Sequence, residues 1–211
     1  MYDTMEFNGQ ALQDKFVLNI TEFKRNGTFV EIGSNDPIVI NNTYLLEKGF
    51  DWTGVMVEYN KTWEPSYKEK RPGSIHIMED ATNIDYPKVF ADAAFPSNID
   101  YLQIDLEVNN GSTFKTLQNL DANIFDNYKF GVVTFEHDIY HTNFLNTRQE
   151  SRNIFEKRGY LRVFSDVTNN GQNPFEDWYV HPELVNMGYV KQLMTHNDTN
   201  NTNSRKINYN I

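Results

Sequence analysis

Phe29-Val-Glu-Ile-Gly-Ser-Asn-Asp36 begins with apolar residues and ends in a glycine turn that carries polar side chains. A second stretch of this kind, Gly54-Val-Met-Val-Glu58, ends in a carboxylate. Buried parallel strands have this form, and their carboxyl ends deliver polar groups to a ligand. Glu58 follows Gly33 by 25 residues, close to the roughly 20 residues between a glycine turn and a ribose-binding carboxylate. The two stretches therefore predict a nucleoside-containing cofactor.

The composition limits the class of protein. At 211 residues, one α/β domain is expected, and 39% hydrophobic residues can fill its core. A formal net charge of −10 argues against nucleic-acid binding, which needs a basic surface. The absence of cysteine excludes disulfides, thiolate zinc sites and cysteine nucleophiles. Residues 1–24 hold no apolar signal core and no stretch approaches roughly 18 apolar residues, so we expect a soluble, cytoplasmic protein that binds no membrane.

Strand-like and helix-like patterns alternate along the chain, which predicts an α/β fold. We predict strands at 28–32, 54–58, 74–78, 101–106, 131–135, 160–164 and 177–180, and helices at 12–23, 42–48, 62–71, 112–120 and 147–158. Five strands alternating with helices indicate a parallel sheet with right-handed crossovers. The last two strands have no helix between them, so they can pair antiparallel at one edge. We predict one domain over 1–196, including a helical extension over 1–26, and a flexible Asn-rich tail over 197–211.

An acidic residue follows each of the first five predicted strands. In an open α/β sheet, the ligand lies beyond the carboxyl ends of the strands. The residues at these ends are, strand by strand, Glu31, Gly33, Ser34, Asn35 and Asp36; Glu58; Glu79, Asp80 and Ala81; Asp105 and Glu107; and Glu136, His137 and Asp138. For Glu79 and Asp138 we favour ordinary helix capping. For Glu58, Asp105 and Glu136, which end apolar runs, we favour a functional role.

The sequence lacks both common phosphate-binding signatures. It contains neither Gly-x-Gly-x-x-Gly nor Gly-Lys-Ser/Thr, whose backbone amides hold phosphates. A ring of carboxylates would repel a phosphate but would suit a cationic cofactor. S-adenosylmethionine is a nucleoside with a sulfonium and no phosphate, so it is the cofactor that we predict.

Further motifs follow in a fixed order: Asn42-Thr-Tyr-Leu-Leu-Glu-Lys48, Trp52-Thr-Gly-Val-Met-Val-Glu58, Asp100-Tyr-Leu-Gln-Ile-Asp-Leu-Glu107, Glu136-His137 and Phe175-Glu-Asp-Trp-Tyr-Val-His-Pro182. Together with residues 29–36, they resemble the FkbM family of S-adenosylmethionine-dependent methyltransferases over residues 28–184. The resemblance implies a Rossmann-like, seven-stranded methyltransferase sheet that is mostly parallel, with one antiparallel strand and helices on both faces. It also implies O-methylation, often of a sugar hydroxyl.

The resemblance also implies roles for individual residues. Glu31, Gly33, Ser34, Asn35 and Asp36 would form the methionine-binding turn, Asn42 and Thr43 would lie over the cofactor, Glu58 would bind the ribose, Asp80 and Ala81 would flank the adenine, and Asp105 would face the donor methyl group. Two positions depart from the family pattern, because Pro37 and Val108 stand where glycine is common.

A sugar hydroxyl is a weak nucleophile, so we expect a base to assist methyl transfer. His137 is the first candidate, with Asp105 and Glu136 either orienting it or joining it as ligands of a divalent cation. Candidate contacts for a sugar or glycan acceptor are Glu107, Tyr140, His141, Trp178 and His181, although a core position for Trp178 is equally consistent with the sequence. Two alternatives remain, a nicotinamide-dependent oxidoreductase and a non-catalytic, cofactor-binding relic of the fold.

Overall fold

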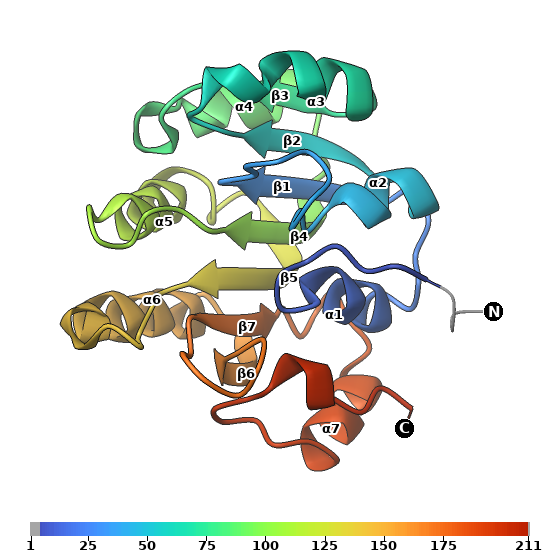
Figure 1. The fold of residues 1–211 in the computed structure, drawn as a ribbon, viewed down its shortest axis with the longest axis vertical. Helices are drawn as coiled ribbons and strands as arrows, with labels where there is room; N and C mark the ends of the chain where they lie inside the picture. The colour runs from blue at the N-terminus through green and yellow to red at the C-terminus, as the bar shows by residue number, and fades with distance from the viewer. Residues whose placement is uncertain (1–4, 211) are drawn as a thin grey trace.

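The computed structural model describes residues 5–210, so residues 1–4 of the predicted extension and residue 211 of the tail lie outside it. Its strands are β1 (Thr28–Ile32), β2 (Thr53–Val57), β3 (Ile75–Ile77), β4 (Asn98–Ile104), β5 (Lys129–Glu136), β6 (Leu161–Val167) and β7 (Glu176–Val180). They form one sheet in the order β3-β2-β1-β4-β5-β7-β6 (Figure 1). β7 runs antiparallel to both of its neighbours, and the other pairs are parallel. The predicted mixed sheet is confirmed.

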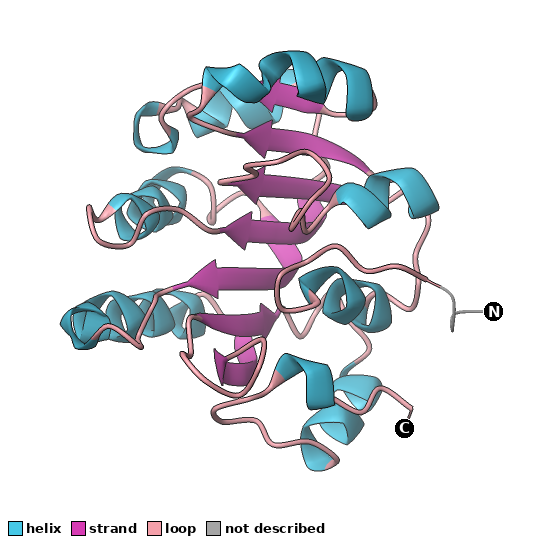
Figure 2. Cartoon of the chain, viewed as in Figure 1, coloured by secondary structure: helices cyan, strands magenta, loops and turns pink. Residues whose placement is uncertain are grey.

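Helices cover both faces of the sheet (Figure 2). One face carries α1 (Gln13–Ile20), α2 (Tyr44–Phe50), α3 (Glu64–Lys70) and α7 (Met187–Thr195), and the other carries α4 (Tyr86–Asp92), α5 (Ser112–Asn123) and α6 (Leu145–Lys157). Short 3-10 turns are η1 (Lys61–Trp63), η2 (Ala81–Asn83), η3 (Thr142–Phe144) and η4 (Ser204–Lys206). None of the described helices is long and apolar enough to cross a membrane.

Successive side chains of a strand point to opposite faces, which divides the interior into two cores. In β4, Tyr101 packs on the α1 side and Leu102 packs on the other side. Phe16 of α1 stacks on Trp178 of β7, with ring centroids 4.6 Å apart. On the α1 side, the side chains become polar at the carboxyl ends of the parallel strands, where Glu31 and Gln103 are buried. This polar strip lies at the edge where ligands bind in open α/β sheets.

Two helices, α4 and α7, were not predicted from the sequence. Each buries only two apolar side chains, Tyr86 and Phe90 in α4 and Val190 and Leu193 in α7. That number is too small to produce a recognisable helical period. Both helices begin at a polar N-cap side chain, Asp85 for α4 and an asparagine for α7.

The Asn-rich tail, predicted as flexible from its composition, has defined partners in the structure. Isolated parallel bridges join Ser165 to Asn200 and Thr168 to Asn203, so the tail extends the sheet beyond β6. The side chain of Thr202 is buried against this edge. A covered edge strand is protected from pairing with another chain.

Candidate functional site

The turn after β1 packs directly against the end of β4. Gly33 has φ +87°, and a Cβ atom at this position would lie 1.7 Å from the Asp105 carbonyl oxygen. Only glycine fits a backbone in this region at such close approach. The amides of Gly33 and Ser34 both donate to the Val57 carbonyl oxygen, at 2.9 and 3.1 Å. The turn is thereby fixed to the ends of two neighbouring strands.

Glu58, at the end of β2, is held in place by two backbone amides. The Asn35 amide donates to its Oε2 at 2.9 Å, and the Asn60 amide donates to its Oε1 at 2.7 Å. A carboxylate has about four lone-pair sites, so both oxygens of Glu58 can still accept hydroxyl groups. Farther along the turn, the Asp36 carboxylate accepts from two amides, each at 2.8 Å. Most amides of this turn therefore have partners within the protein.

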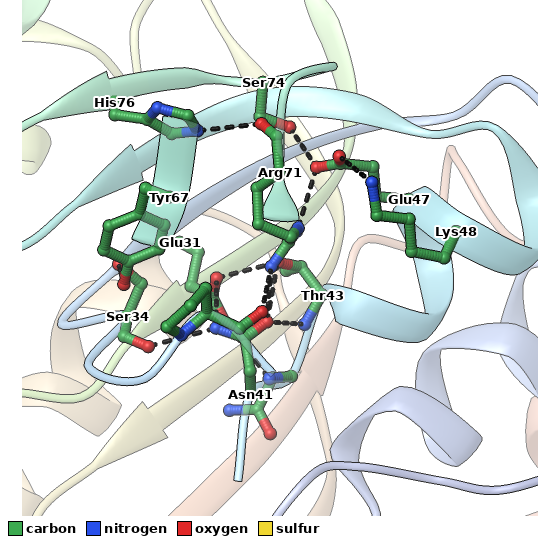
Figure 3. Close-up of polar contacts among 12 residues, drawn as sticks. Glu31, Ser34, Asn41, Thr43, Glu47, Lys48, Tyr67, Arg71, Ser74 and His76 are labelled. Carbon is green, nitrogen blue, oxygen red and sulfur yellow. Dashed lines mark hydrogen bonds and ion pairs between the residues drawn. The ribbon is translucent and has the colours of Figure 1, made fainter. Parts of the chain in front are cut away.

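The loop after the turn is held by the buried side chain of Arg71 (Figure 3). Arg71 Nη1 donates to the Pro37 carbonyl oxygen at 3.2 Å and to Asn41 Oδ1 at 2.8 Å. Its Nη2 donates to Thr43 Oγ1 at 2.8 Å, and its Nε donates to Glu47 Oε2 at 2.9 Å. Pro37 lacks an amide proton, but its carbonyl group has a charged donor. The departure at Pro37 is thus accommodated by an arginine from the end of α3.

Glu31 lies buried beneath this loop. Its Oε2 accepts from Thr43 Oγ1 at 2.7 Å and from Asn41 Nδ2 at 3.2 Å, and its Oε1 accepts from the Asn42 amide at 3.1 Å. Burial raises the pKa of Glu31 to about 7, against the opposing effect of the Arg71 charge. Asn42 Oδ1 is buried without a hydrogen-bond partner among the described residues. Glu31, Asn42 and Thr43 therefore form one cluster beside the glycine turn.

A cavity of about 430 Å³ opens between the carboxyl ends of β2, β3 and β4. Its wall includes apolar side chains and the predicted residues Asp80, Ala81 and Glu107; the lining residues are Val57, Tyr59, Glu79, Asp80, Ala81, Leu106, Glu107, Asn110 and Ser112. The Asp80 carboxylate accepts from the Thr82 amide at 2.9 Å, and hydrogen bonds from Thr82 lower its pKa. Val108, the second departure, is buried beside the cavity-lining Glu107.

Asp105 and Glu136 meet on the α1 side of the sheet, where their carboxyl groups share a hydrogen bond. Gln103 Nε2 also donates to Asp105 Oδ2, at 3.3 Å. Burial raises the pKa of both carboxyl groups, and the Asp105 charge raises that of Glu136 further. The two carboxyl groups therefore share one proton and retain one negative charge between them.

His137 does not join this pair, because neighbouring residues of a strand point to opposite faces. Its side chain is fully buried, and its Nε2 lies 3.3 Å from Asp177 Oδ1 and 3.7 Å from Asp166 Oδ1. Its Nδ1 accepts from the Ile139 amide at 3.2 Å. This position argues against His137 as the base and against Asp105 and Glu136 as the residues that orient it.

The predicted metal set of Asp105, Glu136 and His137 is not assembled. Among residues 5–210, the group whose ligand atoms lie within 4.8 Å of one another is His137, Asp166 and Asp177. Arg152 donates to both carboxylates of this group, and Arg148 donates to Asp166. The two guanidinium groups balance the two carboxylates. Since Nδ1 of His137 accepts a hydrogen bond, Nε2 carries the proton and offers no lone pair to a metal. The cluster is an ion-pair network.

Two of the predicted acceptor contacts are wrong. Trp178 is fully buried in the core against Phe16. His181 lies at the opposite edge of the sheet, where its amide donates to the carbonyl oxygen of Gly131 near the start of β5. An antiparallel strand ends where its parallel neighbours begin, so β7 carries His181 away from the site. Tyr140 and His141 lie in the loop after β5, with ring centroids 4.3 Å apart, and Tyr140 is 42% exposed.

Two residues of the site were missed in the sequence, Arg71 and Glu176. Arg71 follows a helix, where arginine usually faces solvent. Glu176 is the first residue of β7 and pairs in register with Glu136. Because β7 is antiparallel, its first residue lies at the carboxyl edge of its neighbours. The first residue of β7, rather than the residue after the strand, therefore lies at the site.

Comparison with known proteins agrees with the fold. The sequence matches no family model and no curated protein. A proposed rRNA methylase from Clostridium thermocellum has a similar structure, with TM-score 0.53 and 11% identity over 83% of this chain and 97% of that one. A proposed methyltransferase from Streptococcus mutans, in complex with SAH, has TM-score 0.51 and 11% identity over 83% and 99% of the two chains. The protein therefore has the Rossmann-like methyltransferase fold.

Proposed function

We propose that this protein is an S-adenosylmethionine-dependent methyltransferase that acts on a hydroxyl group of a sugar or glycan. One observation carries the proposal: the turn after β1 faces the Glu58 carboxylate and uses its own amides inside the protein. The amides of Gly33 and Ser34 donate to Val57, and that of Asn35 donates to Glu58. A pyrophosphate needs such amides free, whereas a phosphate-free nucleoside does not.

The residues present suit the parts of this cofactor. Glu58 would hold the ribose hydroxyls through its remaining lone pairs. The cavity beside Asp80 and Ala81 has the volume and the apolar wall that an adenine ring requires. Glu31, Asn42 and the glycine turn would hold the amino-acid end, and the unpartnered Asn42 Oδ1 could accept from its ammonium group. S-adenosylmethionine supplies an electrophilic methyl group on a sulfonium.

Asp105 would accept the proton of the acceptor hydroxyl. The pair that it forms with Glu136 retains one negative charge while sharing one proton, and a carboxylate in this position can take up a proton while the oxygen forms its new bond to carbon. Placement of oxygen, carbon and sulfur in a line supplies most of the catalysis in such a displacement. His137 has no part in this mechanism.

The acceptor class is inferred from side chains around Asp105. Sugars stack on aromatic rings and hydrogen-bond to carboxylates, and the loops at this edge offer the exposed ring of Tyr140 together with His141 and Glu107. The net charge of −10 disfavours a nucleic-acid acceptor. The neighbour in complex with SAH shows that this fold can bind the demethylated cofactor.

Isothermal calorimetry tests the cofactor. We expect S-adenosylmethionine and S-adenosylhomocysteine to bind, and Glu58→Gln to weaken both about 10- to 100-fold, the value of a hydrogen bond to a charged group. Glu69→Gln, on the exposed face of α3, is the matched control and should leave both affinities unchanged. If NAD binds and neither S-adenosylmethionine nor S-adenosylhomocysteine does, the result would favour the nicotinamide-dependent oxidoreductase instead.

Methyl transfer from labelled S-adenosylmethionine to a panel of glycans and small alcohols tests the reaction. Product from the wild type and none from Asp105→Asn, at similar cofactor affinity, is the expected result. Cofactor binding without product on any acceptor would favour the non-catalytic relic.

A further inference from the structure

The first turn of α1 reaches the polar strip of the sheet through one side chain. Gln13 is 1% exposed, and its Oε1 accepts from the Ala11 amide at 2.8 Å. Its Nε2 donates to Glu176 Oε1, also at 2.8 Å, in a fully buried contact. Both ends of the Gln13 amide are therefore held in fixed directions, one toward its own helix and one toward the sheet.

Glu176 connects this amide to the proposed reaction centre. It pairs in register with Glu136 across the antiparallel β5–β7 ladder. Directly opposed residues share a face of the sheet, with Cβ atoms about 5 Å apart. Glu136 in turn shares a hydrogen bond with Asp105. A continuous buried path thus runs from Gln13 through Glu176 and Glu136 to Asp105.

Resting on the proposed function, we propose that Gln13 is a positioning residue for methyl transfer, because its hydrogen bond to Glu176 sets the charge that Glu136 and Asp105 experience. A hydrogen bond from an N–H group favours the ionised form of a carboxyl group. An ionised Glu176 repels negative charge on the Asp105–Glu136 pair and so favours a proton on that pair. The amino-terminal helix therefore completes the active site rather than only covering the sheet.

The charge state of Glu176 depends on its burial and on the donors beside it. Burial raises the pKa of Glu176 to about 8, and hydrogen bonds from the side chains of Trp178 and Gln13 oppose that rise. The other titratable groups around the path are Asp14 of α1, Glu31 of β1, Tyr101 of β4, Asp138 after β5 and Asp177 of β7, with His137 and His141 acting on Asp138. Glu176 therefore changes charge close to physiological pH.

Carboxyl-carbon NMR titration of the protein without cofactor tests the coupling. Gln13→Met keeps the side-chain length but removes the amide. It should raise the titration step of Glu176 by about one pH unit and lower the step of the Asp105–Glu136 pair. Gln149→Met, on the exposed face of α6, is the control and should move neither step. The proposal would be overturned if neither step moved in Gln13→Met, or if the steps of Glu176 and of the Asp105–Glu136 pair moved in the same direction.

Glu176→Gln gives a second test, which remains available if Gln13→Met fails to fold. It removes the charge at Glu176, so the step of the Asp105–Glu136 pair should fall. Adding Gln13→Met to this variant should then cause no further movement, and an undiminished effect would show a merely structural role.

The ratio of S-adenosylmethionine to S-adenosylhomocysteine affinity links the path to the reaction, because only the first carries a positive sulfonium. This ratio should change with pH, and in Gln13→Met the midpoint of that change should shift in the same direction as the titration step of the Asp105–Glu136 pair. An unmoved midpoint would overturn the positioning role. Absence of cofactor binding in the wild type would refute the proposed function alone, since the titrations require no cofactor.

Discussion

Replacing Arg71 with methionine should destabilise the protein by about 3 kcal/mol. The side chain of Arg71 is 0% exposed, and that of its partner Glu47 is 5% exposed. Removal of one member of a buried ion pair costs about 3–5 kcal/mol, because the other charge stays buried without compensation. Ser74 Oγ still donates to Glu47 Oε2 at 2.6 Å, which places the expected loss at the lower end. Asn41 and Thr43 also lose a charged donor.

Urea unfolding at pH 7, followed by circular dichroism, measures this loss. Arg25→Met is the matched control, because Arg25 also pairs with a carboxylate, that of Asp51, but both of these side chains are more than half exposed. An exposed pair contributes about 0–1 kcal/mol, so the control should change little. In Arg71→Met/Glu47→Leu neither member of the buried pair remains, and only the solvent-accessible Lys48, which lies 3.4 Å from Glu47, loses a partner. Most of the stability should therefore return.

A loss below about 1 kcal/mol in Arg71→Met would contradict the reasoning, since it would mean that Glu47 finds other compensation or is not buried as a charge. A double variant less stable than Arg71→Met would also contradict it. In either case, the loop that carries Pro37 would have to be held by contacts other than the guanidinium group.

Three further predictions follow from the site. The free energy of unfolding should fall as pH rises from about 4.5 to about 7. In the folded protein Glu31 has a pKa of about 7, so it keeps a proton that the unfolded chain releases. Glu31→Gln should remove about 3 kcal/mol of this pH dependence, measured by urea unfolding at several pH values. Gly33→Ala should abolish cofactor binding in calorimetry, whereas Gly111→Ala, also at positive φ but with no atom within 4 Å of the added Cβ, should cost only about 1 kcal/mol of stability. His137→Gln should lower the melting temperature yet leave cofactor affinity within about twofold, and a larger affinity loss would return His137 to the site.

The sheet could be predicted because its signals are local. Each strand is an apolar run bounded by turn residues, and the missing helix before β7 indicated the antiparallel strand. The helices α4 and α7 could not be predicted, since each relies on two buried side chains and a polar cap. The strand order was not predicted, because it depends on contacts between segments that are distant in the sequence.

The candidate site could be predicted in part. Glu31, Gly33 and Glu58 lie at the carboxyl ends of parallel strands, so their common location at one edge is a consequence of topology. His137 was misassigned because one step along a strand reverses the face, and His181 because β7 reverses direction. The buried contacts of Arg71 and Glu176 could not be predicted, because arginine and glutamate are common on protein surfaces.

The contact between Gln13 and Glu176 joins residues 163 positions apart in the sequence. β6 is made before β7, the strand that lies beside it in the sheet. Final closure must therefore wait for the β6–β7 hairpin, which pairs with β5 and receives α1 in the same late step. Long-range closure of this kind slows folding.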